Sequence, residues 1–342
     1  MRSRPLLLAA LLLVLLVLPA AALAAADHGF DAPADHDTSQ QLQAPGYIGP
    51  NAQRNNTPND PDYDSAEPDD PDNGGKTSIY DEQFDLFGFA SRRTPTTVYS
   101  DPNDPRVGKL QIAGFNAAGA WKETRGDPGT TVAILDTGIK WDNAGLRLKV
   151  HLNTGELPKP EDAQGRPAAS YDLNGDGAVN VDDYKNDPRV SITWPGRAGP
   201  PGLITAQDLI HAFSDHTDAD HNGFVDDIAG WDFFNNDNDP FDQSSYFAAS
   251  NHGTGRTGEA VEQGNDGEGA IGVCPKCQFV PVRVWDTFVS DGDTFGLGIF
   301  YGTKIGAKVI EGADGNLYHS KFTEAASQFA LRPGRHPDLL GR

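Results

Sequence analysis

Basic residues are scarce in this 342-residue sequence. It has 27 Lys and Arg residues against 49 Asp and Glu residues, which gives a formal net charge of -22. A chain with this charge repels phosphate backbones and anionic lipid, so we expect no nucleic-acid partner and no binding to a membrane surface. The acidic residues are concentrated in Asp-, Asn- and Gly-rich stretches, where they could instead bind a cation.

Cysteine is almost absent, because the sequence has only Cys274 and Cys277 in a C-x-x-C pair. A zinc site needs a second pair of ligands, and none is found at a suitable spacing. A thioredoxin-type site would place the pair at the start of a helix, whereas residues 278–285 are expected to form a strand. We therefore favour a local disulfide, as is usual outside the cytoplasm.

The N-terminal 26 residues have the features of a secretory signal peptide. Arg2 and Arg4 precede an apolar run over residues 6–18, and small residues follow before Asp27. We expect cleavage before Asp27 and a secreted, extracellular protein. An uncleaved membrane anchor is the alternative, because the apolar stretch with its alanines approaches the length of a membrane span.

Residues 27–113 are not expected to contribute a core. Residues 27–78 are acidic and nearly free of apolar periodicity, which predicts disorder. Residues 79–113 begin with a cluster of aromatic and aliphatic side chains, and are interpreted as an N-terminal extension or a propeptide remnant that docks on the main domain. The pair Arg92-Arg93 is either a processing site or an ordinary surface pair.

From residue 114 onward, short apolar runs alternate with helical patterns. The alternation predicts an α/β fold with a parallel sheet flanked by helices, because a strand, a helix and a strand in succession favour parallel pairing. The last helix shows apolar residues at helical spacing and has Ser320 in position to cap it. The expected helices cover residues 117–122, 294–304 and 321–330, and the expected strands cover residues 130–135, 279–284 and 308–310.

Two motifs indicate the chemistry. Residues 132–138 form an apolar run that ends in Asp136-Thr137-Gly138, and residues 251–254 read Asn-His-Gly-Thr with Gly258 four positions on. With Ala120-Trp121 before the first motif and residues 268–275 and 280–284 after the second, they resemble the subtilisin-like serine proteases (subtilases). The resemblance covers residues 114–330, the N-terminal part of the expected catalytic domain.

The resemblance implies roles for several residues. Asp136 would orient and stabilise the imidazolium of His252, and His252 would act as general base and then as general acid. Ala313, Asp314 and Gly315 would line the cleft with backbone for an extended polypeptide substrate. The sequence departs from the family at Gly255, and at residues 311–313, which read Glu-Gly-Ala instead of Asn-Met-Ser.

The family's nucleophile motif, Gly-Thr-Ser, does not occur in the sequence, and neither does the oxyanion Asn. Residues 331–342 are basic and Pro-rich, whereas the sequence before them is acidic. This change in composition suggests a shift of reading frame near Leu331. We therefore expect the polypeptide as given to be inactive. The alternative function is that of a non-catalytic, secreted, calcium-binding protein, and the oligomeric state is left open.

Calcium is the expected cofactor, in two loops of an insertion at about residues 142–245. The loop 172–183 fits the twelve-residue EF-hand pattern, with Gly177 at the turn, and the loop 218–227 resembles a calcium segment of the family. A solvated Asp-Gly turn cluster is the alternative for the first loop. The expected ligands are Asp172, Asn174, Asp176, the Ala178 carbonyl, Asn180 and Asp183 in the first loop, and Asp218, Asp220, Asn222, Phe224, and Asp226 or Asp227 in the second.

Overall fold

The computed structural model describes residues 83, 86, 117–121, 123–244, 251–266, 269–287, 289–313, 315 and 318–332. The expected signal peptide (residues 1–26), the acidic segment (27–78), the Arg92-Arg93 pair and residues 333–342 of the tail lie outside this range. Among the described residues, no helix has the length and apolar character needed to cross a membrane.

A four-stranded parallel sheet forms the centre of the fold, in the order β2-β3-β1-β4. Its strands are β1 (Thr131–Asp136), β2 (Trp231–Asp232), β3 (Gln278–Arg283) and β4 (Val309–Glu311). Every residue of β1 and β3 is buried, as expected for strands covered on both faces. The predicted α/β fold with a parallel sheet is confirmed, and β1 separates the two later strands β3 and β4.

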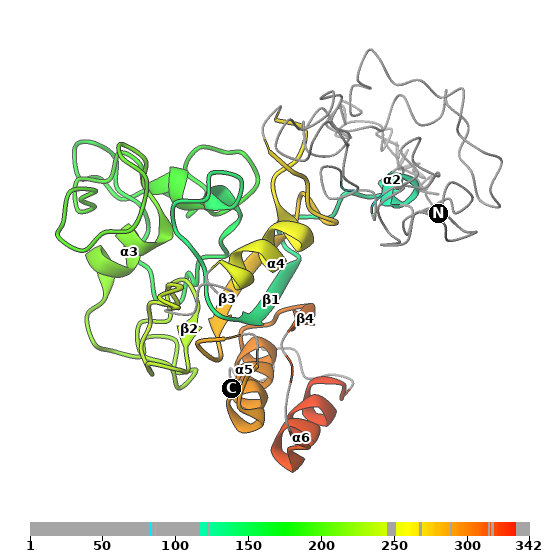
Figure 1. Ribbon diagram of the computed structural model, residues 1–342. Helices are drawn as coiled ribbons and strands as arrows, with labels where there is room; N and C mark the ends of the chain where they lie inside the picture. Colours follow the sequence, from blue (N-terminus) through cyan, green and yellow to red (C-terminus); the bar gives the residue numbers. More distant parts are fainter. Residues whose placement is uncertain are drawn as a thin grey trace, which may run out of the picture.

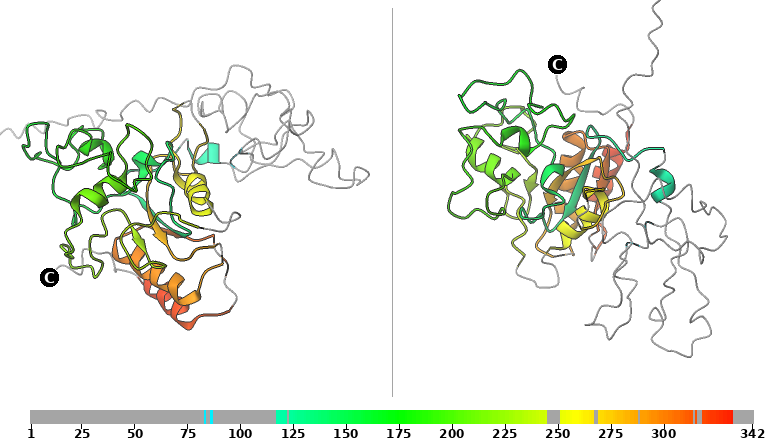
Figure 2. Two further views of the ribbon diagram at one scale, coloured as in Figure 1. Left: turned by 60° about the vertical axis from the view of Figure 1, so that its left-hand side comes forward. Right: turned by 90° about the horizontal axis from the view of Figure 1, so that it is seen from above.

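Alternate residues of β1 enter two different cores. Val132 and Ile134 pack with Phe279, and Val261 of helix α4 (His252–Val261) belongs to the same cluster. Ala133 and Leu135 pack with Ile299 of helix α5 (Gly292–Lys304) on the opposite face. Figure 1 shows α4 on one side of the strands and α5 with α6 on the other. The left view of Figure 2 shows the same arrangement.

The segment between β1 and α4 builds most of the first core. It contains the 3-10 helices η5 (Arg147–Lys149) and η6 (Val181–Tyr184) and the helix α3 (Ala206–Phe213). Leu152, Tyr184 and Leu209 from this segment are almost fully buried. It also supplies β2, an edge strand that the sequence did not predict, so the expected insertion is an integral layer of the domain.

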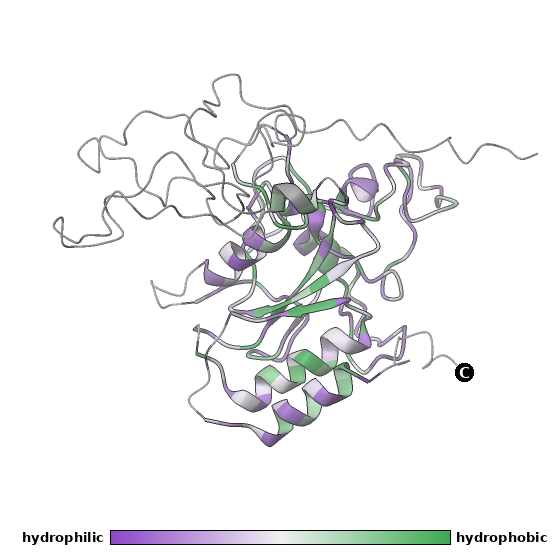
Figure 3. Cartoon of the chain, turned by 90° about the vertical axis from the view of Figure 1, so that its right-hand side faces the viewer, coloured by the Kyte–Doolittle hydropathy of each residue, from purple (hydrophilic) through white to green (hydrophobic). Residues whose placement is uncertain are grey.

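The predicted helices are present in the C-terminal part. Asp291 caps α5 by accepting hydrogen bonds from the backbone of the first turn, and Ser320 caps α6 (Lys321–Ala330) through the Thr323 N–H. Helix α6 packs on α5, where the rings of Phe300 and Phe329 lie 5.3 Å apart. The two helices run side by side in Figure 3, with apolar and polar residues mixed along α6. The helix is only partly covered, because Ala326 is its one buried residue of those the structure describes.

Residues Gln83 and Leu86 lie in the segment that was expected to dock. The Gln83 amide donates to the Ile271 carbonyl and accepts from the Ile271 N–H, at 2.8 Å each. Leu86 is only 1% exposed. Gln83 therefore contacts the main domain, and the interpretation of residues 79–113 as an N-terminal extension or a propeptide remnant stays a prediction.

A glycine in α5 allows this helix to pack closely on the sheet. A Cβ atom at Gly298 would lie 2.9 Å from side-chain atoms of Leu135 and Val284. We expect Gly298→Ala to destabilise the domain by about 1–3 kcal/mol, because overpacking outweighs the helix propensity of alanine. The matched control is Gly255→Ala in α4, where a Cβ atom meets nothing within 4 Å.

The control should be neutral or stabilising by up to about 1 kcal/mol. Urea unfolding followed by circular dichroism measures both variants. Equal stability of the two variants would show that α5 does not need the glycine for its packing.

Candidate active site and metal cluster

Asp136 and His252 lie in direct contact at the end of the sheet. Asp136 is the last residue of β1 and is 1% exposed, and His252 is the first residue of α4. The His252 Nδ1 atom lies 2.8 Å from Oδ1 and 2.9 Å from Oδ2 of Asp136. With the proton on Nδ1 directed at the carboxylate, Nε2 is the ring nitrogen that can accept a proton from another group.

The contact depends on the close approach of α4 to the turn after β1. A Cβ atom at Gly253 would lie 2.3 Å from the Gly138 carbonyl oxygen and 3.1 Å from Cβ of Asp136, so only glycine fits. The Gly253 N–H donates to the Thr137 hydroxyl oxygen at 3.1 Å. The residues that follow Asp136 and His252 in sequence therefore hold the two side chains together.

Asp242 joins the same two elements through its buried carboxylate, which is 0% exposed. Its Oδ2 atom accepts from the Thr137 hydroxyl at 3.2 Å and from the Asn251 N–H at 2.7 Å. Asn251 precedes α4 in a left-handed conformation and has no capping bond from its own side chain. Asp242 thus supplies a cap-like acceptor from outside the helix. No sequence signal distinguished it among the many Asp residues of this segment.

Arg283 supports the turn from the neighbouring strand. Its Nε donates to the Thr137 carbonyl at 3.1 Å, and its guanidinium forms 2.7 Å ion pairs with Asp232 and Asp286. The Arg283 side chain is 1% exposed. Because a buried guanidinium needs partners for its charge, this residue fixes the ends of β1, β2 and β3 relative to one another.

The predicted substrate segment lies beyond β4. Ala313 is exposed, and Asp314 lies outside the described residues. The Gly315 carbonyl accepts from the Ser290 N–H at 3.0 Å, within an isolated bridge to Val289. Ala313 and Gly315 are both exposed, and the carbonyl of Gly315 already has a backbone partner.

The pair Cys274 and Cys277 forms a disulfide just before β3. The adjacent Val273 carbonyl accepts a hydrogen bond from the Trp121 indole at 2.9 Å. This bond joins the disulfide turn to the residue that follows α2 (Ala117–Ala120). The local disulfide favoured by the sequence is the form that the structure contains.

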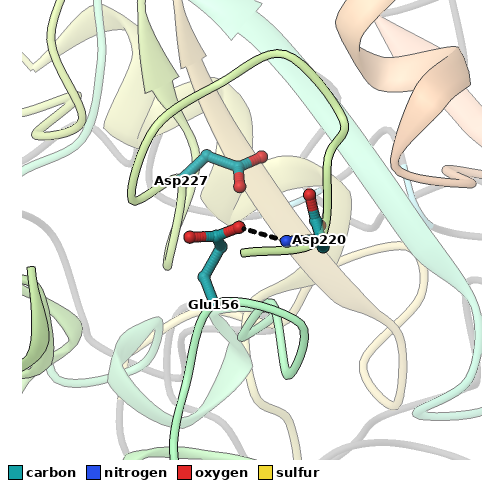
Figure 4. A group of neighbouring side chains, drawn as sticks. All are labelled: Glu156, Asp220 and Asp227. Carbon is teal, nitrogen blue, oxygen red and sulfur yellow. Dashed lines mark hydrogen bonds between the residues drawn. The ribbon is translucent and has the colours of Figure 1, made fainter. Parts of the chain in front are cut away.

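Three carboxylates meet near the second predicted calcium loop. Glu156, Asp220 and Asp227 each offer a ligand atom, and these atoms lie within 4.8 Å of one another. Figure 4 shows the three side chains converging, with the Asp220 N–H donating to Glu156 Oε1 at 2.9 Å. Sequence reasoning identified Asp220 and Asp227 but missed Glu156, because it lies 64 positions from Asp220 and belongs to no loop motif.

Amide groups and burial define the surroundings of this cluster. Asn153 and Asn222 both donate side-chain hydrogen bonds to Asp220 and to Asp227, at 2.8–3.1 Å. Burial raises the pKa of Asp227 to about 7, although hydrogen bonds oppose this shift. Burial also raises the pKa of Glu156. A cavity of about 210 Å³ adjoins the cluster and reaches Tyr301 of α5.

The remaining residues of this loop are placed differently. Asp226 accepts from the N–H groups of Asp215 and His216, so Asp227 is the residue that faces the other carboxylates. Asp218 accepts from the N–H groups of Asn222 and Gly223, which shapes the turn. The Phe224 ring packs against Trp231 and Tyr301.

In the loop 172–183, the acidic side chains accept hydrogen bonds from backbone N–H groups of the same loop. Asp172 accepts from the N–H groups of Gly175 and Gly177, and Asp176 accepts from the N–H of Ala178 and from the side-chain amides of Asn174 and Asn180. The buried Asp183 accepts from Leu173, Asn174 and Asn180 N–H groups. Over the described part of the chain, Glu156, Asp220 and Asp227 are the one group of three such ligands within 4.8 Å. Calcium binding by this loop stays a prediction.

Comparisons with known proteins agree with the motifs. Residues 127–328 match the model of the Subtilase family. The chain is 33% identical over 159 residues to the thermophilic serine proteinase of Bacillus sp. (strain AK1). The matched region covers 44% of this chain and 36% of that protein. The chain therefore spans about a third of that relative. A solved structure of proteases from Pseudoalteromonas arctica PAMC 21717 is similar at 23% identity and a TM-score of 0.30, over 68% of this chain and 56% of that one.

The role of Asp242 can be measured without any substrate. We expect Asp242→Asn to shift or remove the low-field NMR signal of the His252 Nδ1 proton, because an amide nitrogen would replace an acceptor that holds α4. The matched control is Asp239→Asn. The Asp239 carboxylate also accepts side-chain hydrogen bonds, from the Trp141 indole and the Gln207 amide.

Both variants should lower the melting temperature, because each disturbs hydrogen bonds to a carboxylate. Only Asp242→Asn should change the His252 signal. If the His252 signal is unchanged in folded Asp242→Asn, Asp242 contributes to the stability of the fold but does not position His252.

Proposed function

The chain belongs to the subtilase family, and on this premise we propose that it forms the Asp and His part of an exported, calcium-stabilised serine endopeptidase. The observation that supports the proposal is the contact of His252 Nδ1 with both carboxylate oxygens of Asp136, at 2.8 and 2.9 Å. Extended polypeptides are the proposed substrates.

The geometry suits acid–base work by His252. Asp136 is buried and accepts a hydrogen bond from Nδ1–H, which would fix the tautomer and stabilise the imidazolium that forms during catalysis. The His252 side chain is 23% exposed, so the imidazole remains accessible from solvent. Nε2 would take the proton of a serine hydroxyl and later give it to the leaving amine.

The serine nucleophile is not among the 342 residues, because no Gly-Thr-Ser motif occurs in them. A polypeptide of these residues alone should therefore not react with a serine-directed fluorophosphonate. Removal of the nucleophile from subtilisin itself lowers kcat by a factor of roughly 2 × 10⁶, so hydrolysis without a serine should be negligible. Stoichiometric labelling of Ser320 or Ser327 would contradict this expectation.

The genomic DNA downstream of the Leu331 codon tests the function itself. If the reading frame has shifted, one of the two alternative forward frames should encode a Gly- and Asn-rich segment and then a Gly-Thr-Ser motif. The chain joined to that segment should hydrolyse casein, and Asp136→Ala or His252→Ala should abolish the activity. The control is His319→Ala, because His319 is exposed and pairs only loosely with Glu324.

If no forward frame contains the motif, the second candidate becomes the better one. This candidate is a non-catalytic, secreted, calcium-binding protein in which Asp136 and His252 remain as scaffold. The observation that favours it is the cluster of Glu156, Asp220 and Asp227, which needs no nucleophile.

The carboxylate cluster fits a calcium ion by its donor chemistry. Calcium binds 6–8 oxygen ligands at about 2.3–2.6 Å, so ligands on opposite sides of one ion lie about 5 Å apart. The ligand atoms of Glu156, Asp220 and Asp227 lie within 4.8 Å of one another. Three carboxylates this close repel one another, and a bound cation would remove that repulsion and join two distant loops.

Calcium should therefore bind and stabilise the chain. At a calcium concentration 100-fold above the dissociation constant, we expect a stabilisation of about 2.7 kcal/mol per site, which is lost on adding EDTA. Glu156→Gln should weaken one site without affecting the loop 172–183, and Asp172→Asn should weaken the other. Calorimetry and thermal unfolding with and without calcium measure both effects.

The matched control for these variants is Asp215→Asn. Asp215 is an exposed acid of the same region, and its carboxylate accepts from Thr217 and not from the cluster. If Glu156→Gln and Asp215→Asn take up calcium equally well, the cluster is not a calcium site.

A further inference from the structure

Glu311 lies on the same face of the sheet as Asp136. In the parallel pairing of β1 with β4, Glu311 is the partner of Ile134. Partners in adjacent strands point to the same face, and residues two apart along a strand do so as well. Glu311 therefore points toward the face that carries Ile134 and Asp136, which is the face covered by α4.

Helix α4 presents His252 and Arg256 one turn apart, so the two side chains lie on the same side of the helix. Arg256 forms a 2.7 Å ion pair with Glu259, but its Nε is buried without a hydrogen-bond partner. Glu311 Oε2 is likewise buried without a partner, and no ion pair joins Glu311 to Arg256 among the described side chains. The Glu311 carboxyl thus lies on the face that α4 covers, and no ion pair of the described side chains neutralises it.

The electrostatic surroundings agree with this placement. Burial, and after it the negative charges of Asp136 and Glu259, raise the pKa of Glu311 to about 7. The positive charges of Arg256 and of a protonated His252 act in the opposite direction. Among the described residues, these four groups on β1 and α4 have the largest electrostatic effects on Glu311.

We propose that Glu311 is a positioning residue for the Asp136–His252 pair: its carboxyl releases a proton to solvent and so places a second negative charge beneath the imidazole. With Glu311 neutral, Asp136 alone stabilises the imidazolium. With Glu311 charged, two carboxylates attract the imidazolium, which therefore holds its proton more firmly. The proposal rests on the proposed function of the pair, but it is measured separately.

The test is a carboxyl-carbon NMR titration of Glu311 in the 342-residue chain. The wild-type midpoint should lie at about 7, well above the ordinary 4.5 of a glutamate. Asp136→Asn removes a negative charge and should lower this midpoint by about half a pH unit or more, a roughly threefold change in proton affinity. Because coupling free energy is reciprocal, the same factor measures the effect of Glu311 on the pair.

Two controls separate a specific coupling from a general effect of charge. Glu259→Gln removes an exposed acid of α4 and should lower the midpoint less than Asp136→Asn does. His319→Gln changes an exposed side chain that pairs with Glu324, and it should leave the midpoint unchanged. If Asp136→Asn does not fold, Arg256→Gln gives a second measurement. It removes a positive charge that lowers the pKa of Glu311, so it should raise the midpoint.

A Glu311 midpoint near 4.5, or one that Asp136→Asn leaves unchanged, would overturn the proposal. So would a midpoint that Arg256→Gln leaves unchanged. The proposed function fails in a different experiment. In that case the chain joined to the downstream segment does not hydrolyse casein, while the Glu311 midpoint still shifts in Asp136→Asn.

Discussion

The docking of the N-terminus of α4 on the carboxyl end of β1 is the constraint on which the site depends. The strand delivers Asp136, the helix delivers His252, and a Cβ atom at residue 253 would collide with the backbone of residue 138. Thr137 is central to this joint, since its hydroxyl accepts from α4 and donates to Asp242 while its carbonyl accepts from Arg283. Buried polar groups of this kind stabilise a structure only when all partners are in place, so the joint forms as a unit.

The packing of the sheet explains why the joint is rigid. Both faces of β1 are covered, one by the segment between β1 and α4 and the other by α5, and the strand is central in the described sheet. A displacement of α4 would therefore disturb the core around Val261 and Ile134 as well as the hydrogen bonds at its N-terminus. Close-packed cores resist such small displacements, which keeps the His252 ring at hydrogen-bonding distance from Asp136.

Local patterns were sufficient to predict the strands β1, β3 and β4, the helices α5 and α6, and the Ser320 cap, because periodicity and capping act over a few residues. The motifs also identified Asp136 and His252. The sequence did not indicate Glu156, Asp242 or β2, because each acquires its role from partners far along the chain. Asp242, for example, acts on Thr137, which lies 105 positions away. An Asp-rich segment offers many equivalent carboxylates, and only the fold distinguishes them.

The separation of Glu156 from Asp220 in sequence has a consequence for the order of folding. These residues lie 64 positions apart, so the cluster is absent until the chain between them has closed into a loop. If calcium binds there as proposed, it recognises the collapsed domain and hardly the unfolded chain. The calcium content of the medium would then set how long the domain stays folded, and the same polypeptide would be short-lived in one compartment and durable in another.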